Sequence, residues 1–259
     1  MNGIERIEHR FKQGPVFVAY LTAGDGGIQR TLDAALALIE GGVTLLEIGV
    51  PFSDPIADGP VIQRAAMRAL AAGTTLKDVL WLVSEIRKRS AVPLILFSYL
   101  NPILSVLHTS FFDDAREAGL DGALLVDCPI EESGIFHQAC LKQHMAPIYV
   151  ITPSTPLERI QRIDRDGHGF LYYACQKGTT GVRSTLPADF NENIKRIKSA
   201  VHLPVVCGFG ISTTNAVRDV LHVADGVVVG SLFVKAMEED ITTHALTQLT
   251  RHLFFKEAL

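Results

Sequence analysis

The sequence lacks the features that mark several large classes of protein. It contains only four cysteines among 259 residues, and no two of them form a CxxC pair. This usage argues against a disulfide scaffold and predicts free thiols in a reducing compartment. No apolar run is long enough to cross a membrane, and segment 1–14 mixes both charge signs without an apolar stretch. We therefore expect a cytoplasmic protein with no membrane association.

Signs of nucleic-acid binding and of metal binding are also missing. The net charge is −4, without a basic cluster, so no surface for nucleic acid is expected. The nine histidines show neither an HExxH motif nor close pairing with cysteines, so no metal site is expected. No GxSxG, Walker or kinase signature is present. A hydrophobic content of 47% nevertheless provides material for a large core.

Short β-branched runs alternate with amphipathic stretches along the whole chain. Most of the runs are continuously apolar, which is typical of parallel strands covered on both faces. The expected strands are Val16–Thr22, Val43–Gly49, Leu94–Tyr99, Gly122–Asp127, Ile148–Thr152, Phe170–Ala174, Pro204–Gly208 and Gly226–Gly230. The expected helices are Gln29–Glu40, Gln63–Ala71, Leu76–Arg89, Ser110–Ala118, Glu131–Lys142, Leu157–Asp164, Phe190–Ser199, Asn215–His222, Leu232–Glu239 and Thr243–Phe255.

This alternation predicts a single (β/α)₈ barrel, a TIM barrel, as one domain over residues 1–259. The spacing of Ile4, Ile7 and Phe11 predicts an extra helix over 3–12 that closes the bottom of the barrel. A short extra helix is expected after the eighth strand. A doubly wound open sheet is the alternative, but the TAGDGG run after the first strand lacks the GxGxxG spacing of that fold.

Glu47 is the first candidate for a catalytic residue. It shares one face of the second expected strand with Leu45 and Gly49. Because helices cover the outer face, we expect Glu47 inside the barrel near the carboxyl-terminal rim, where barrel active sites lie. Desolvation should raise its pKa, so that it could act as an acid and then as a base. The alternative is a structural carboxylate paired with a buried Lys or Arg.

Asp58 is the second candidate, on a loop that Pro51 and Pro55 stiffen. Two carboxylates in different environments can divide acid and base roles around one substrate. The alternative for Asp58 is a loop cap, and for Asp54 a helix or turn cap.

Glycine-rich turns are expected after strands seven and eight, in CGFGIST (207–213) and VVGSLF (228–233). In barrels, such turns followed by a helix N-terminus bind phosphate through backbone N–H groups. The candidates are Gly208, Gly210, Gly230 and Ser231, and the alternative is plain strand-ending or helix-capping glycine. Segment 176–190 is small, polar and glycine-containing, so it suits a mobile lid, or else an ordinary surface loop.

The run LEIGVPFSDPIADGP (46–60) resembles the highly specific signature of the tryptophan synthase alpha subunit family. Further similar segments follow in the family's order over nearly the whole chain: YLTAGD (20–25), AAGTT (71–75), PLILFSYLNPI (93–103), LLVDCPIEES (124–133), GFLYYACQKGTTG (169–181), GFGIS (208–212) and VVGSLFVK (228–235). Two departures are Asp25-Gly26-Gly27, where the family more often has proline after the aspartate, and Gln176-Lys177-Gly178 at the start of the lid. These departures concern the lid and signalling between subunits rather than the chemistry.

The resemblance implies a role for each matching residue. The implied roles are catalysis for Glu47 and Asp58, the indole pocket for Tyr20 and Tyr99, a position near the catalytic glutamate for Tyr172, lid closure for Thr180 and Gly181, phosphate binding for Gly210, Gly230 and Ser231, and contact with a beta subunit for Pro51, Asp54 and Asn101.

The implied activity is a carbon–carbon lyase reaction, in which indole-3-glycerol phosphate yields indole and glyceraldehyde 3-phosphate. The resemblance also implies an α₂β₂ assembly with a beta subunit that carries pyridoxal phosphate (PLP), and no cofactor in this chain. The alternatives are an indoleglycerol-phosphate synthase, a phosphoribosyl isomerase, a stand-alone indole-releasing lyase, and a catalytically weak alpha-like subunit that mainly activates its partner.

Overall fold

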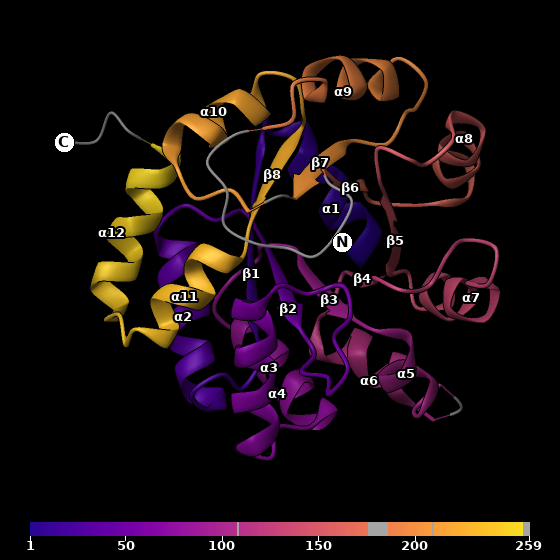
Figure 1. Ribbon diagram of the computed structural model, residues 1–259. Helices are drawn as coiled ribbons and strands as arrows, with labels where there is room; N and C mark the ends of the chain where they lie inside the picture. Colours follow the sequence, from indigo (N-terminus) through magenta and orange to yellow (C-terminus); the bar gives the residue numbers. More distant parts are fainter. Residues whose placement is uncertain (108, 176–185, 209, 256–259) are drawn as a thin grey trace.

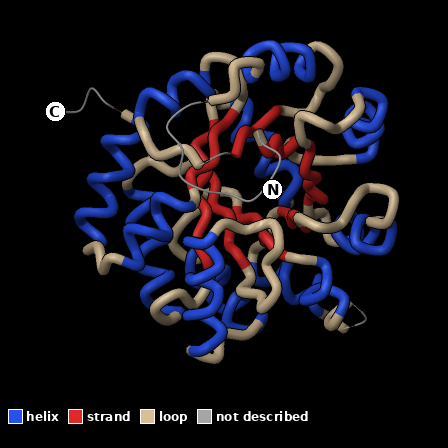
Figure 2. The backbone as a smooth tube through the Cα atoms, in the orientation of Figure 1, coloured by secondary structure: helices blue, strands red, loops and turns tan. Residues whose placement is uncertain are grey.

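Eight parallel strands form a closed barrel in the computed structural model, which describes residues 1–107, 109–175, 186–208 and 210–255. Each strand pairs with the next, and β8 pairs with β1. The strands are β1 (Val16–Thr22), β2 (Leu45–Gly49), β3 (Leu94–Ser98), β4 (Gly122–Leu125), β5 (Ala146–Ile151), β6 (Leu171–Ala174), β7 (Val205–Gly208) and β8 (Gly226–Val229). In Figure 1 the labelled strands surround the barrel axis, and Figure 2 shows them as an inner ring with most helices outside it. The predicted (β/α)₈ barrel is confirmed.

The helices of the described residues follow the strands in the order expected for this fold. They are α1 (Gly3–Lys12), α2 (Ile28–Glu40), α3 (Pro60–Ala71), α4 (Leu76–Arg87), α5 (Leu100–Leu104), α6 (Phe111–Ala118), α7 (Gly134–Lys142), α8 (Leu157–Asp166), α9 (Phe190–Lys198), α10 (Thr214–Leu221), α11 (Ser231–Glu238) and α12 (Thr243–Phe254). The short helix predicted after the eighth strand is α11.

Two apolar cores lie on opposite sides of the strand ring. The larger core joins the outer strand faces to the helices and includes Leu46 and Ile48. The smaller core fills the barrel and includes Leu45 and Ile95. Because side chains alternate along a strand, Glu47 shares the inner face with Leu45. The barrel interior is therefore apolar below Glu47.

Helix α1 closes the amino-terminal end of the barrel. It begins with a capping box formed by Asn2 and Glu5. Ile7 is fully buried in the inner core, and Ile4 and Phe11 pack against that core. The predicted plug is confirmed. Since the plug blocks one end, substrate access is confined to the carboxyl-terminal end.

Several elements differ from the sequence predictions, and three of these differences have an identifiable reason. Strand β2 begins after Val43, because the Val43 N–H bonds Leu38 O at the end of α2. Helix α7 begins after Ser133, because turns starting at Pro129 and Ile130 use residues 131–133. Helix α5 was not predicted. Its first N–H, on Leu100, bonds the Asp127 carboxylate at 2.7 Å, a long-range contact that local sequence does not reveal.

Candidate active site

Glu47 lies inside the barrel near the end of β2, as predicted. Its side chain is fully buried, and within the described part of the chain neither carboxyl oxygen has a hydrogen-bond partner. Burial without compensation raises its pKa from 4.5 to about 8. The described residues offer no ion-pair partner that would make it a structural carboxylate. Glu47 is therefore protonated near neutral pH and can deliver a proton into the barrel.

Asp58 is also buried but has a partner. The Tyr99 hydroxyl donates a hydrogen bond to Asp58 Oδ2 at 3.0 Å and accepts one from the Ala57 N–H at 3.0 Å. Burial raises the Asp58 pKa to about 6, and the Tyr99 hydrogen bond opposes this rise. Asp58 is thus mostly ionised at neutral pH while Glu47 is mostly protonated. Environments that separate two carboxyl pKa values in this way assign the acid and the anion.

Both carboxylates line one cavity at the carboxyl-terminal end of the barrel, and its volume is about 50 Å³. Its aromatic walls contact each other: the Tyr20 and Phe97 rings are 5.1 Å apart, edge to face, and the Phe97 and Tyr172 rings are 6.4 Å apart. The lining residues are Tyr20, Glu47, Asp58, Ile62, Phe97, Tyr172, Gly208, Gly210, Val228, Gly230 and Ser231. A narrow space between rings suits a flat aromatic group.

Two glycines make room for the tyrosine hydroxyls of this cavity. A Cβ atom on Gly49 would lie 2.2 Å from the Tyr20 hydroxyl, and one on Gly208 would lie 2.1 Å from the Tyr172 hydroxyl. Such contacts are far shorter than van der Waals distance, so both positions exclude larger residues. Gly208 was predicted only as a phosphate-binding residue. The structure gives it a steric role beside Tyr172.

The turn after β8, beside Tyr20, has features that could hold an anion. Gly230 is the N-cap of α11 and provides no side-chain cap, so the first N–H groups of α11 are not bound by a cap side chain. In α10, by contrast, the Thr213 side chain accepts from the Ala216 N–H at 3.3 Å. Gly210 adopts a positive φ of 37° in the preceding loop. With Gly230 and Ser231 in the cavity lining, α11 offers backbone donors and the positive end of its dipole.

The remaining predicted residues fall in different places. Tyr99 is not part of the cavity lining, since it stands behind Asp58. Asp54 is exposed on the loop after β2 and Asn101 is exposed on α5, whereas Pro51 is buried. The lid residues Thr180 and Gly181 lie outside the described residues, so their closure over substrate stays a prediction.

Three apolar lining residues were missed by the sequence analysis. Phe97 has the inward position two residues after Ile95, so strand alternation could have found it. Ile62 and Val228 carry no local signal that separates them from core residues. Sequence reasoning finds unusual residues in a site more easily than ordinary apolar ones.

Metal chemistry finds no support in the described ranges of the chain. They contain no group of three or more His, Cys, Asp or Glu placed to hold a metal ion. The four cysteines are free and buried. No helix among the described residues is long and apolar enough to cross a membrane.

The fold and the site together define a class: a closed parallel barrel in which two carboxylates of different pKa and a helix N-terminus line the same aromatic cavity. The family model for the tryptophan synthase alpha chain matches residues 8–258. The chain belongs to this family.

Individual relatives agree with that assignment. The chain is 52% identical over 250 residues to a tryptophan synthase alpha chain of Coxiella burnetii, covering 96% of this chain and 97% of the relative. It is similar to the solved tryptophan synthase subunit alpha of Legionella pneumophila, with a TM-score of 0.87, 35% identity and coverage of 98% and 97%. It also resembles a chain of tryptophan synthase from Mycobacterium tuberculosis, with a TM-score of 0.86, 30% identity and coverage of 97% and 95%.

Proposed function

We propose that this chain cleaves indole-3-glycerol phosphate to indole and glyceraldehyde 3-phosphate in tryptophan biosynthesis. The observation that carries the proposal is the pair of carboxylates in one cavity, with pKa values of about 8 for Glu47 and about 6 for Asp58. The reaction needs both a proton donor and an anion near an indole ring. It also needs a site for a phosphate, which the N-terminus of α11 supplies.

The reaction is the reverse of an aldol addition. Protonated Glu47 gives its proton to indole C3, which interrupts the aromatic ring and weakens the bond between C3 and the glycerol carbon. The resulting Glu47 carboxylate takes the proton of the hydroxyl on that carbon as the C–C bond breaks. The bonding electrons return to the ring, and the glycerol carbon becomes an aldehyde. The carboxyl group ends protonated, as it began.

Asp58 supports this step without transferring the reacting protons. As an anion it accepts a hydrogen bond from the indole N–H and stabilises the positive charge that develops on the ring nitrogen. Tyr20, Phe97 and Tyr172 hold the ring between them. Gly210, Gly230 and Ser231 bind the phosphate, which fixes the reacting carbon near Glu47.

We further propose that the chain assembles with a beta subunit as α₂β₂, that the beta subunit carries PLP, and that this chain needs no cofactor. Asp54 is exposed on the loop that leads to Asp58, and Asn101 is exposed on α5. Ile56, which lies between Asp54 and Asp58 in the sequence, exposes 76% of its surface. Exposed apolar side chains on a rim suit a protein partner. Pro51 is buried, so its contribution would be to the shape of the loop. A cytoplasmic location stays a prediction from the sequence.

The test is indole release from indole-3-glycerol phosphate by the purified chain, alone and with its beta subunit. Release that the beta subunit accelerates is expected. Release of equal rate in both cases would indicate a stand-alone lyase. No release in either case, from folded protein, would favour an activating subunit without its own chemistry and would contradict the proposal.

A further inference from the structure

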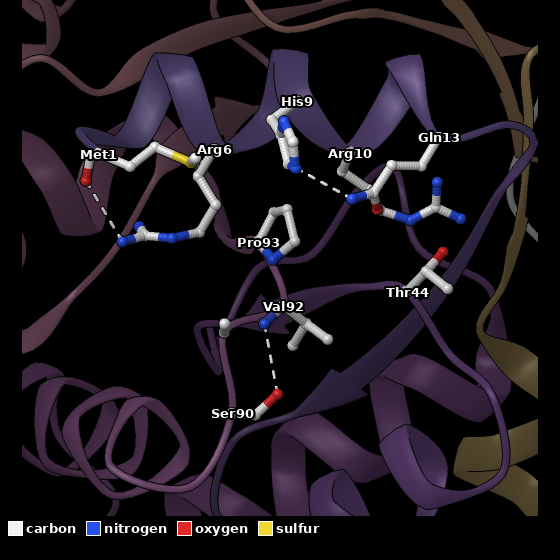
Figure 3. Close-up of a pocket in the computed structure, with 10 residues that line it drawn as sticks. Met1, Arg6, His9, Arg10, Gln13, Thr44, Ser90, Val92 and Pro93 are labelled. Atoms are coloured by element: carbon white, nitrogen blue, oxygen red, sulfur yellow. Dashed lines mark hydrogen bonds between the residues drawn. The ribbon is translucent and has the colours of Figure 1, made fainter.

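A second hollow lies at the opposite, amino-terminal end of the barrel, between α1 and the loop 90–93 (Figure 3). Its volume is about 530 Å³, much more than that of the cavity around Glu47. The lining residues are Met1, Arg6, His9, Arg10, Gln13, Thr44, Ser90, Ala91, Val92 and Pro93. None of them carries a carboxylate. This hollow, which we call the basal groove, takes no part in the proposed catalysis.

Positive charge exceeds negative charge beside the basal groove. The Asp121 carboxylate is fully buried and binds the guanidinium groups of both Arg6 and Arg87. The side chains of Arg6 and Arg87 are only 24% and 18% exposed. One anion therefore serves two partly buried cations, which leaves one positive charge without compensation. Uncompensated charge of this kind is costly in a partly desolvated place.

Arg10 adds a second unbalanced cation. Its guanidinium donates to the backbone oxygens of Gly14 at 3.2 Å and Pro15 at 2.7 Å. In the described part of the chain it forms no ion pair, and burial lowers its pKa. These two carbonyl oxygens lie just after the end of α1 and fix the direction of the Arg10 side chain. They do not neutralise its charge. Three of its five N–H groups are left over.

The two arginines are arranged to receive separate groups. Figure 3 shows Arg6 and Arg10 leaving α1 on the side of loop 90–93, with their guanidinium groups turned toward opposite ends of the groove. Neutral donors lie in the same lining. The Ser90 hydroxyl accepts from the Val92 N–H at 3.3 Å and keeps its own hydrogen, and the Gln13 amide uses one hydrogen at most on His9.

We propose that the basal groove binds a small molecule carrying two oxyanion groups, one at Arg6 and one at Arg10. Phosphate and carboxylate groups both fit, because each accepts the forked N–H pair of a guanidinium. This site is independent of the lyase reaction. The α1 plug and the inner core lie between it and Glu47.

Titration with propane-1,3-bisphosphonate and with glutarate, followed by amide chemical shifts, tests the proposal and separates the two chemistries. Methylphosphonate serves as the ligand with a single anionic group. At least one of the two-headed ligands should shift the amide signals of Gln13, Gly14 and residues 90–92, and Arg10→Gln should weaken that binding about tenfold. Ser90→Ala, which leaves the packing of α1 alone, should weaken it less.

The matched control is Arg162→Gln on α8, which removes an arginine that is 47% exposed and does not line the groove. It should leave the affinity unchanged, and indole release should survive in all three variants. Shifts confined to residues 208–231 would place the ligand in the catalytic cavity and overturn the proposal. Equal affinity for methylphosphonate, or normal binding by Arg10→Gln, would overturn it as well.

Discussion

Glu47 and Asp58 differ because of the partners that the chain gives them. Glu47 has no hydrogen-bond partner among the described residues, and burial raises its pKa to about 8. Asp58 receives the Tyr99 hydroxyl, which stabilises its anion and limits its pKa to about 6. The difference between the residues is one of hydration and hydrogen bonding rather than of chemical type.

Glu47 should make stability depend on pH. The folded chain keeps the Glu47 proton up to about pH 8, whereas an unfolded chain releases it near 4.5. Between these values the folded state binds more protons, so stability falls as pH rises. Because glutamine cannot ionise, Glu47→Gln should lack this loss. Relative to that of the wild type, its free energy of unfolding should increase by a few kcal/mol between pH 5 and 9, at about 1.4 kcal/mol per pKa unit.

Urea unfolding at pH 5, 7 and 9 measures this difference. The exposed Glu117 supplies the control, since Glu117→Gln makes the same chemical change on a side chain that is 70% exposed. A difference between Glu47→Gln and wild type that does not vary with pH would show that Glu47 ionises normally in the folded chain.

Tyr99→Phe should affect catalysis through Asp58. Without the hydroxyl, the pKa of Asp58 should rise above about 6, so less of the required anion exists near neutral pH. We expect kcat/KM to fall several-fold at pH 6.5 and to recover toward the wild-type value at pH 8. A pH–rate profile measures this. Tyr149→Phe, which removes a buried hydroxyl bound to Ser133 and His137, should leave the profile in place. A uniform loss at every pH would instead point to a displaced loop.

At the scale of elements, a charged cluster ties α3 to α11. Arg68 donates to both carboxyl oxygens of Asp25, at 2.7 and 2.9 Å, and to Glu238 at 2.7 Å. Arg64 also binds Glu238 through two bonds of 2.7 Å, and these hydrogen bonds hold the pKa of Glu238 at about 2. Helix α3 follows the Asp58 loop, and α11 begins at the glycine turn that we propose binds the phosphate. The cluster thus fixes two walls of the cavity relative to each other.

Arg68→Met should loosen this connection. Asp25 is 4% exposed and would lose its cation, which should lower the free energy of unfolding by about 1–3 kcal/mol. The N-terminus of α11 would be less firmly held, so KM for the phosphorylated substrate should rise more than kcat falls. Steady-state kinetics and urea unfolding measure both effects. Arg162→Met, at an exposed pair with a 3.9 Å separation, should change stability by less than about 0.5 kcal/mol. An unchanged KM in Arg68→Met would show that the charged cluster does not affect substrate binding.

At the scale of the whole molecule, the barrel order and the inward position of Glu47 could be predicted because they depend on local periodicity. Strand alternation alone decides which face Glu47 shares with Leu45. The steric pairing of Gly208 with Tyr172 and the bond from Tyr99 to Asp58 join different strands or loops. The relative positions of these residues depend on how the barrel closes, so no local sequence pattern predicts the two contacts. Helix α5 was missed for the same reason, since Asp127 caps it from another loop.

The two ends of the barrel have separate tasks. The carboxyl-terminal end holds the carboxylates and the glycine turn before α11, while the amino-terminal end holds the α1 plug and the basal groove. We propose that residues 1–259 nevertheless act as one domain, since the closed strand ring joins first and last strands. Every catalytic role above depends on Glu47 keeping its proton in an apolar interior at neutral pH.

The pH dependence of kcat/KM for indole-3-glycerol phosphate cleavage tests this most directly, with wild type and Glu47→Gln compared at each pH. Wild-type activity should rise through about pH 6 as Asp58 ionises and decline above about pH 8 as Glu47 loses its proton. Glu47→Gln should be slower by about 10²–10⁴-fold and should lack the decline. Near wild-type activity in Glu47→Gln, or a decline above pH 8 that persists in that variant, would contradict the assignment of Glu47 as the proton donor.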